Sequence, residues 1–162
     1  MSNDFYTSKI LPYAGIIIKI CRAYTNNQQD FEDNYQEVCL QIWRSRENFK
    51  GDSEWSTWIY RISLNVCLTI AKKKKNSTQE INEKHLNDTT DESGFISEDS
   101  LKELYIAIKK LPEIDRAVIL LYLEEKSSQE IADIIGTKPL NIRVRINRIK
   151  TKLKTLLDGK IN

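Results

Sequence analysis

Arginine and asparagine side chains recur at helical spacing in the last quarter of the chain, in a pattern suited to binding a polyanion. Between Lys138 and Lys154 there are seven cations and no acid. Arg and Asn form paired hydrogen bonds with base edges in a DNA major groove, and cations bind phosphates. We therefore predict that this segment binds duplex DNA. The residues assigned to this site are Ser127, Lys138, Asn141, Arg143, Arg145, Asn147 and Arg148.

The surrounding residues predict two helices separated by a glycine turn. Ser127 and Glu130 form an S-x-x-E capping box, in which each side chain satisfies a backbone N–H of the other. Gly136 can take the positive φ that ends such a helix, and Pro139 fits the first turn of the next. One apolar stripe follows, formed by Ile142, Ile146, Ile149, Leu153 and Leu156. This pattern is typical of a helix-turn-helix; an ordinary solvated basic helix is the alternative.

A second group of candidate residues combines aromatic rings with cations. Rings stack on unpaired bases while cations bind the phosphates of single-stranded nucleic acid. We predict that Trp58 is part of the core and that Tyr60 is exposed, whereas Phe49 and Trp55 fit either role. A row at helical spacing adds Arg61, Asn65, Leu68 and Lys72, on a different face from the tryptophans. The candidates for this surface include Phe49, Lys50, Trp55, Tyr60, Arg61, Asn65, Lys72 and Lys73.

A third candidate surface lies on an acidic segment near residue 30. Asp30, Glu32 and Asp33 favour a helix N-terminus through the helix dipole, which is a sufficient structural explanation for them. Farther along, polar side chains leave a face beside the apolar stripe. That face is suitable for docking another protein, and it comprises Gln36, Glu37, Gln41 and Arg44.

The charge of the chain is unevenly distributed. Residues 1–76 carry 11 basic and 8 acidic residues, residues 77–100 carry 1 and 7, and residues 101–162 carry 13 and 8. Two basic blocks therefore flank an acidic connector. Basic blocks imply a polyanionic partner, and the connector resembles a solvated tether.

Several classes of protein are disfavoured by the sequence. The three cysteines are widely spaced and lie in apolar helical patterns, so we expect buried free thiols and no metal site. A single histidine and the lack of a phosphate loop or nucleophile motif argue against an enzyme, a cofactor and a small-molecule substrate. No signal peptide or membrane span is evident, so we expect a cytoplasmic protein.

Apolar spacing predicts an all-α fold of two small domains joined by an acidic flexible linker. Helices are expected near residues 8–24, 30–48 and 53–75, and the predicted domain ranges are 1–76 and 101–162, with the linker at 77–100. The inward face of the third helix is expected to comprise Trp55, Trp58, Ile59, Ile62, Val66 and Ile70.

Together these motifs resemble the extracytoplasmic-function (ECF) group of bacterial RNA polymerase sigma factors, of the sigma-70 family. The resemblance covers roughly residues 8–75 and 101–157 and has both blocks in the expected order. It is carried by three segments, DFEDNYQEVCLQIW, FKGDSEWSTWIYRISLNVCLTIAKKKK and LPEIDRAVILLYLEEKSSQEIADIIGTKPLNIRVRINRIKTKL. The first two match sigma region 2 and the last matches sigma region 4.

The resemblance implies a role for each segment. The residues matching the contact with the clamp helices of core RNA polymerase are Asp30, Asp33, Gln36, Glu37 and Trp43. The loop that captures a flipped base of the promoter −10 element matches Phe49, Lys50, Gly51, Asp52, Ser53 and Trp55, and the helix facing that element matches Arg61 and Asn65. The helix inserted at the −35 element matches Asn141, Arg143, Arg145, Asn147 and Arg148.

Two positions depart from the family pattern. Thr69–Lys72 stands where members often carry an acidic residue followed by a Tyr-Leu-Arg-like end, and Asn141–Ile142 stands where Thr-Val is usual. The −35 preference of the family therefore does not transfer to this chain.

The resemblance implies core RNA polymerase and promoter DNA as partners, and an anti-sigma factor, often membrane-spanning in the family. The alternative is a free-standing helix-turn-helix regulator that acts without polymerase. Such a regulator would bind duplex DNA tightly alone and would not need the aromatic and basic first block.

Overall fold

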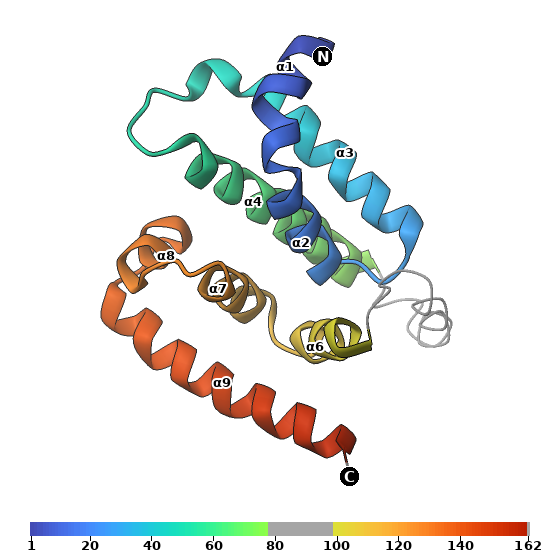
Figure 1. Cartoon of the computed structure of the whole chain (residues 1–162), viewed down its shortest axis with the longest axis vertical. Coiled ribbons are helices and arrows are strands. Elements are labelled where there is room, and N and C mark those ends of the chain that lie inside the picture. The colour runs from blue at the N-terminus through green and yellow to red at the C-terminus, as the bar shows by residue number, and fades with distance from the viewer. Residues whose placement is uncertain (78–98, 162) are drawn as a thin grey trace. The chain divides into compact units, whose positions relative to one another are not determined.

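The computed structural model describes residues 1–77 and 99–161. The chain divides into two compact units, Met1–Phe95 and Ile96–Asn162. Every regular element in the described ranges is helical (Figure 1), so the predicted all-α fold is confirmed. None of these helices is long and apolar enough to cross a membrane. Most of the predicted linker, 77–100, lies outside the described residues.

The first unit opens with an irregular helical segment that leads into α2 (Ala14–Ala23). Pro12 lies in a short 3-10 turn, and because proline lacks an N–H it interrupts a continuous α-helical ladder. The single helix expected at 8–24 is therefore wrong in this detail. The elements before α2 are α1 (Asn3–Phe5), a π-helical turn (Tyr6–Ile10) and a 3-10 turn (Leu11–Tyr13).

Two longer helices follow in the described part of the first unit, α3 (Gln28–Arg44) and α4 (Trp55–Ser77). Asn27 caps α3, because its side-chain oxygen accepts a hydrogen bond from the backbone N–H of Asp30 at 2.8 Å. α3 ends at Arg44 rather than continuing to residue 48, and a 3-10 turn (Arg46–Asn48) follows.

The core face of α4 overlaps the predicted one only in part. Ile59 of the expected stripe is fully buried, whereas Ile62, Val66 and Ile70 of that stripe are only half-buried. The core instead includes Leu64 and Cys67, which are at most 2% exposed. Apolar residues lie on two adjacent faces of α4. Because periodicity measures the spacing and not the identity of the buried face, it could not choose between them. The small side chains of Ser63 and Cys67 are fully buried.

The cysteines of this unit are free and buried, as predicted. The Sγ atoms of Cys21 on α2 and Cys67 on α4 lie 3.9 Å apart. Burial raises the pKa of the Cys39 thiol to about 11. The buried thiols thus serve as small apolar side chains where α2, α3 and α4 meet.

Over residues 99–161 the second unit contains four helices, and the last two form the predicted helix-turn-helix. They are α6 (Asp99–Lys109), α7 (Glu113–Leu123), α8 (Ser128–Ile135) and α9 (Pro139–Ile161). The Ser127 capping box is confirmed by reciprocal hydrogen bonds of 3.1 and 3.0 Å with Glu130. Gly136 ends α8 with φ of 90°, which is strained for any residue with a Cβ.

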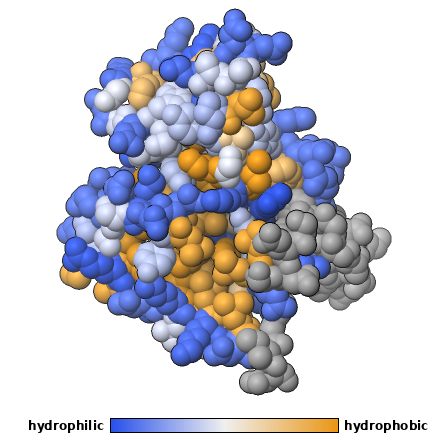
Figure 2. Space-filling view, in the orientation of Figure 1, coloured by the Kyte–Doolittle hydropathy of each residue, from blue (hydrophilic) through white to orange (hydrophobic). Residues whose placement is uncertain are grey.

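The predicted stripe of α9 is the side that enters the core. Ile142, Ile146, Ile149 and Leu153 are 0–8% exposed, and Leu156 is half-buried. In the view of Figure 2, apolar residues gather on the side of α9 that faces α6 and α7, while hydrophilic residues lie along its outer edge. The stripe therefore fixes which side of α9 is presented outward.

Candidate protein and nucleic-acid interfaces

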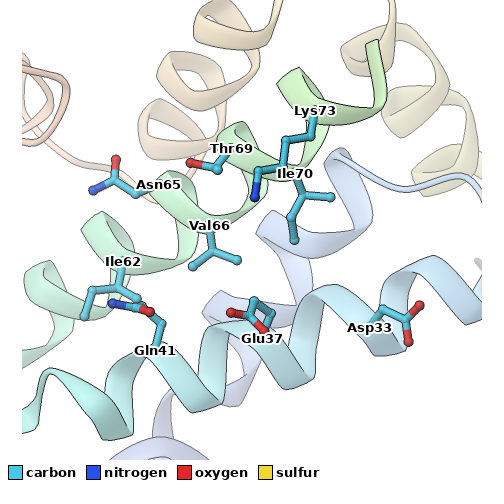
Figure 3. A pocket seen from close by; sticks show the side chains of 9 residues that line it. All are labelled: Asp33, Glu37, Gln41, Ile62, Asn65, Val66, Thr69, Ile70 and Lys73. Carbon is cyan, nitrogen blue, oxygen red and sulfur yellow. The ribbon is translucent and has the colours of Figure 1, made fainter. Parts of the chain in front are cut away.

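A groove between α3 and α4 brings together residues that we predicted for two different partners (Figure 3). Its volume is about 670 Å³. The wall from α3 carries Asp33 and Glu37, and the wall from α4 carries Asn65 and Lys73. The remaining lining residues of this α3–α4 groove are Gln41, Ile62, Val66, Thr69 and Ile70.

The α3 wall of the groove is acidic, whereas the α4 wall is largely apolar with polar residues among its apolar ones. Such a groove suits an amphipathic surface that carries a cation. Glu37 lies 3.7 Å from Arg44, and both side chains are largely exposed, so solvent screens this pair strongly. Asp33 accepts a hydrogen bond from Gln29 at 3.0 Å. Both carboxylates therefore remain accessible to a partner's basic side chain.

The other predicted docking residues are spread along α3, two near its ends and one in its middle. Asp30 forms an ion pair of 2.9 Å with Lys74 of α4, so it also ties the two helices together. Gln36 is exposed on the middle of the helix. Trp43 is half-buried near the C-terminus, where the Arg46 guanidinium lies 3.7 Å from its ring centroid.

Aromatic rings from three segments form one cluster beside the loop that joins α3 to α4. Phe5 of α1 packs edge-on against Trp43 and Trp55, with centroid distances of 5.1 and 6.4 Å. Phe49 packs against Trp55 at 5.0 Å. This tryptophan cluster comprises Phe5, Trp43, Phe49, Trp55 and Trp58.

The tryptophan cluster is anchored by the N-terminal segment. The indole N–H of Trp55 donates a 2.7 Å hydrogen bond to the backbone carbonyl of Lys9. The Lys9 ammonium lies 5.7 Å from the same ring. Sequence analysis missed Phe5 and Lys9, because they precede the first regular apolar pattern.

The loop after Phe49 presents a polar, conformationally special segment. Gly51 has φ of 80°, a value that favours glycine. Lys50 and Asp52 are exposed, and Ser53 is half-buried. Phe49 and Trp55 flank this segment. The loop therefore combines a ring surface for stacking with hydrogen-bonding groups.

The helix after this loop, α4, carries the remaining polar and cationic residues predicted for this surface. Asn65, Lys72 and Lys73 are exposed, and Arg61 is half-buried. Tyr60 is only 3% exposed, so the expectation that it is exposed is wrong. It lies four residues before Leu64 on the face that forms the core.

The outer face of α9 carries the predicted duplex-binding side chains. Arg143 and Arg148 are exposed, and within the described residues neither forms an ion pair with an acid. Lys138, Asn141 and Asn147 are also exposed.

Two residues of the predicted duplex-binding set have structural partners. Arg145 donates a 2.6 Å hydrogen bond to Asp115 of α7, and its side chain is 37% exposed. Ser127 caps α8, and hydrogen bonds from Ser127 hold the pKa of Glu130 below its usual range.

Sequence analysis also missed two apolar residues on this face. Leu140 is 66% and Val144 52% exposed. Counting positions from the buried stripe would have placed Val144 on the opposite side of the helix. In the described ranges, no group of three or more His, Cys, Asp or Glu side chains could hold a metal ion.

Comparison with known families matches both units. The family described as Sigma-70 region 2 matches residues 10–77. The family described as Sigma-70, region 4 matches residues 101–153. The N-terminal residues 1–9, which include Phe5 and Lys9, lie before both matches.

Two curated relatives illustrate the similarity. RNA polymerase sigma factor SigZ of Bacillus subtilis is 30% identical over 83% of this chain and 76% of that protein. ECF RNA polymerase sigma factor SigG of Mycobacterium tuberculosis is 29% identical over 90% of this chain and 46% of that protein. The chain thus spans about half the length of SigG.

Solved structures share the fold at low sequence identity. The sigma factor RpoE, in complex with the anti-sigma factor NepR from Bartonella quintana, has a TM-score of 0.74 at 20% identity, covering 97% of this chain and 98% of that chain. CnrH, in complex with the cytosolic domain of CnrY, has a TM-score of 0.69 at 19% identity, covering 98% and 90%.

Proposed function

Because this chain belongs to the ECF group of the sigma-70 family of RNA polymerase sigma factors, we propose that it binds core RNA polymerase and directs it to promoters. In this proposal residues 1–76 bind the polymerase and the −10 element. Residues 101–162 bind the −35 element, and residues 77–100 join them. The protein contributes recognition and DNA opening, with no chemistry of its own.

The observation that carries this proposal is that one chain has two different surfaces whose residues suit nucleic acid. The first unit offers an aromatic cluster beside a polar loop, which suits unpaired bases. The second offers a basic helix whose opposite side is buried, which suits a major groove. A protein that only bound duplex DNA would need the second surface alone.

The polymerase contact is assigned to the polar side of α3. Asp33, Gln36 and Glu37 supply accessible acceptors and amide groups, and Asp30 and Trp43 extend the surface toward both helix ends. Region 2 family membership supports this assignment. A basic segment of the polymerase would find both charge complementarity and the apolar side of the α3–α4 groove.

The −10 contact is assigned to the loop after α3 and to α4. Taking a base out of the stack costs a few kcal/mol, so the capturing site must supply a comparable gain in binding. Trp55 and Phe49 supply a ring surface. The polar and charged groups assigned here are Lys50, Gly51, Asp52, Ser53, Arg61, Asn65, Lys72 and Lys73. Tyr60 is left with a packing role because it is buried.

The −35 contact is assigned to the outer face of α9. Arg143, Arg148 and Asn147 are the residues best placed to reach base edges, with Lys138 and Asn141 near the helix start. Arg145 is partly exposed on this face and also forms an ion pair with Asp115. A bidentate contact between an arginine and a guanine contributes about 1–3 kcal/mol of discrimination.

We further propose a cytoplasmic location. We also propose control by an anti-sigma factor, since a sigma factor of the same fold has been solved in complex with one. A protein that covers the α3–α4 groove would block the docking residues Asp33 and Glu37 and the DNA residue Asn65 together.

The test is transcription with purified bacterial core polymerase on fragmented DNA from the source of the chain. We expect discrete new RNA 5′ ends only when both proteins are present, and their upstream sequences would define the promoter. If no new start sites appear and the protein alone binds duplex DNA tightly, it is a free-standing helix-turn-helix regulator instead.

A further inference from the structure

The outer face of α9 contains two apolar side chains among its cations and amides. Leu140 and Val144 are 66% and 52% exposed. Single exposed apolar residues are common and need no explanation by themselves. The position of these two residues is what distinguishes them, because they lie four residues apart and so occupy the same side of the helix.

Val144 lies at the centre of the outward face. On a helix with 3.6 residues per turn, it points roughly 170° away from the mean direction of the four buried stripe residues. Asn147 and Arg148 follow it by three and four residues and are exposed. Whatever this face of α9 contacts therefore meets Val144 first, with hydrogen-bonding side chains beside it.

The charge of α9 identifies the kind of partner. Seven cations and no acid lie between Lys138 and Lys154, and this pattern is complementary to a DNA backbone. In a major groove the one apolar group on the base edges is the C5 methyl of thymine. An exposed valine at the centre of an inserted helix matches that group, and it offers nothing to the purine acceptors nearby.

We propose that Val144, with Leu140 one turn before it, selects thymine in the −35 element by contact with its C5 methyl group. This inference rests on the proposed function, since it requires α9 to enter a duplex. Arg143, Asn147 and Arg148 would then read or clamp the neighbouring positions. Thymine is thus selected by apolar contact, without a hydrogen bond from the valine.

The experiment replaces each −35 thymine, one at a time, with deoxyuridine in a promoter identified by transcription with core polymerase. Deoxyuridine removes only the methyl and retains both pairing and the O4 acceptor. We expect the complex of polymerase and this protein to bind about fourfold less tightly at one or two positions, which corresponds to about 0.8 kcal/mol for one methyl-sized group. Substitution in the spacer should have no effect.

Variants then assign the methyl contact to a residue. Val144→Ala should bind the thymine promoter more weakly and lose its sensitivity to deoxyuridine at the position that Val144 contacts. Val144→Ile should retain that sensitivity. Arg148→Ala is the matched control, because it should weaken binding to both DNAs equally and preserve the fourfold ratio. Thermal unfolding should be the same for all of them, since these side chains are exposed.

Three results would overturn the proposal. If the complex binds the promoter but no deoxyuridine position weakens it, no methyl is read, and the proposed function stands without this inference. If the fourfold loss persists in both Val144→Ala and Leu140→Ala, another residue reads the methyl. If the protein directs polymerase to no promoter, the proposed function fails and takes this inference with it.

Discussion

Arg145 and Arg143 are two residues apart in α9 and have different surroundings. Arg145 is paired with Asp115 at 2.6 Å, whereas Arg143 is exposed. We expect Arg145→Ala to lower the free energy of unfolding by about 0.2–1 kcal/mol, the range of a solvent-screened ion pair. Arg143→Ala should leave stability unchanged within about 0.5 kcal/mol and weaken promoter binding. Urea unfolding and promoter binding, measured on both variants, separate the two roles.

Asp115→Ala provides the matched test of this pair. If the pair is responsible, the double variant should lose less stability than the two single losses added together. The difference is the coupling energy, and it should be about the size of the ion pair. Equal loss of promoter binding in both arginine variants, at unchanged stability, would show that Arg145 also contacts DNA.

Glu37 is the residue through which the polymerase contact is most directly tested. It lies in the α3–α4 groove with an accessible carboxylate. Glu37→Lys reverses the charge that a basic partner would meet, so we expect core polymerase affinity to fall about tenfold or more. Glu47→Lys, the same charge reversal at an exposed residue outside the groove, is the control. Titration of labelled protein with core polymerase gives both affinities, and an unchanged value for Glu37→Lys would contradict the α3 assignment.

Among the elements, α8 depends on its capping box. Ser127→Ala removes the side-chain acceptor of the Glu130 N–H and should destabilise the second unit by about 1 kcal/mol. Ser127 was also predicted as a DNA contact, so promoter affinity at a temperature where the variant is folded tests that second role. Thr151→Ala, on the exposed side of α9, is the stability control.

The same box makes stability depend on pH. Hydrogen bonds from Ser127 lower the pKa of Glu130, so the folded state favours the carboxylate. Its contribution is therefore complete above the ordinary glutamate pKa of about 4.3 and is lost as the pH falls through the lower pKa of the folded state. Glu130→Gln keeps a hydrogen-bond acceptor but cannot titrate, so its unfolding midpoint should change less over this acid range.

The N-terminal segment is an element that packs against the proposed −10 surface. Phe5 contacts both Trp43 and Trp55, and aromatic pairs contribute about 0.5–1.5 kcal/mol each. Phe5→Ala should therefore lower the stability of the first unit by about 1–2 kcal/mol and weaken binding of a −10 single strand by the polymerase complex. Thr7→Ala is the control in the same segment. Unchanged strand binding by Phe5→Ala would leave the segment a purely structural role.

The sequence predicted the second unit better than the first. In α9 a single apolar stripe is opposed by charge, so spacing alone identified the buried side. In α4 the core face contains Ser63 and Cys67, whereas larger apolar residues line the α3–α4 groove. Sequence spacing favoured the larger residues because it does not register how closely a neighbouring helix approaches. The contacts of Phe5 and Lys9 depend on tertiary structure alone.

At the scale of the whole molecule, two compact units carry separate cores and separate surfaces. A two-domain reader gains from effective concentration, because one bound unit holds the other near its site. The acidic charge of residues 77–100 opposes binding of that segment to phosphates. This division of charge is consistent with the proposal that the two basic units bind DNA and the connector does not.

All three tryptophans of the chain belong to the tryptophan cluster of the first unit. Tryptophan fluorescence, excited selectively over tyrosine, therefore reports on one unit of the intact chain, whereas circular dichroism reports helices in both. Ile131→Ala, a fully buried change in the second unit, should cost about 2–5 kcal/mol and lower the dichroism transition while leaving the emission transition in place. Equal shifts in both signals would mean that the units unfold together. The same tryptophan emission should also change when a DNA single strand binds at the loop after Phe49, so this binding can be measured without an added label.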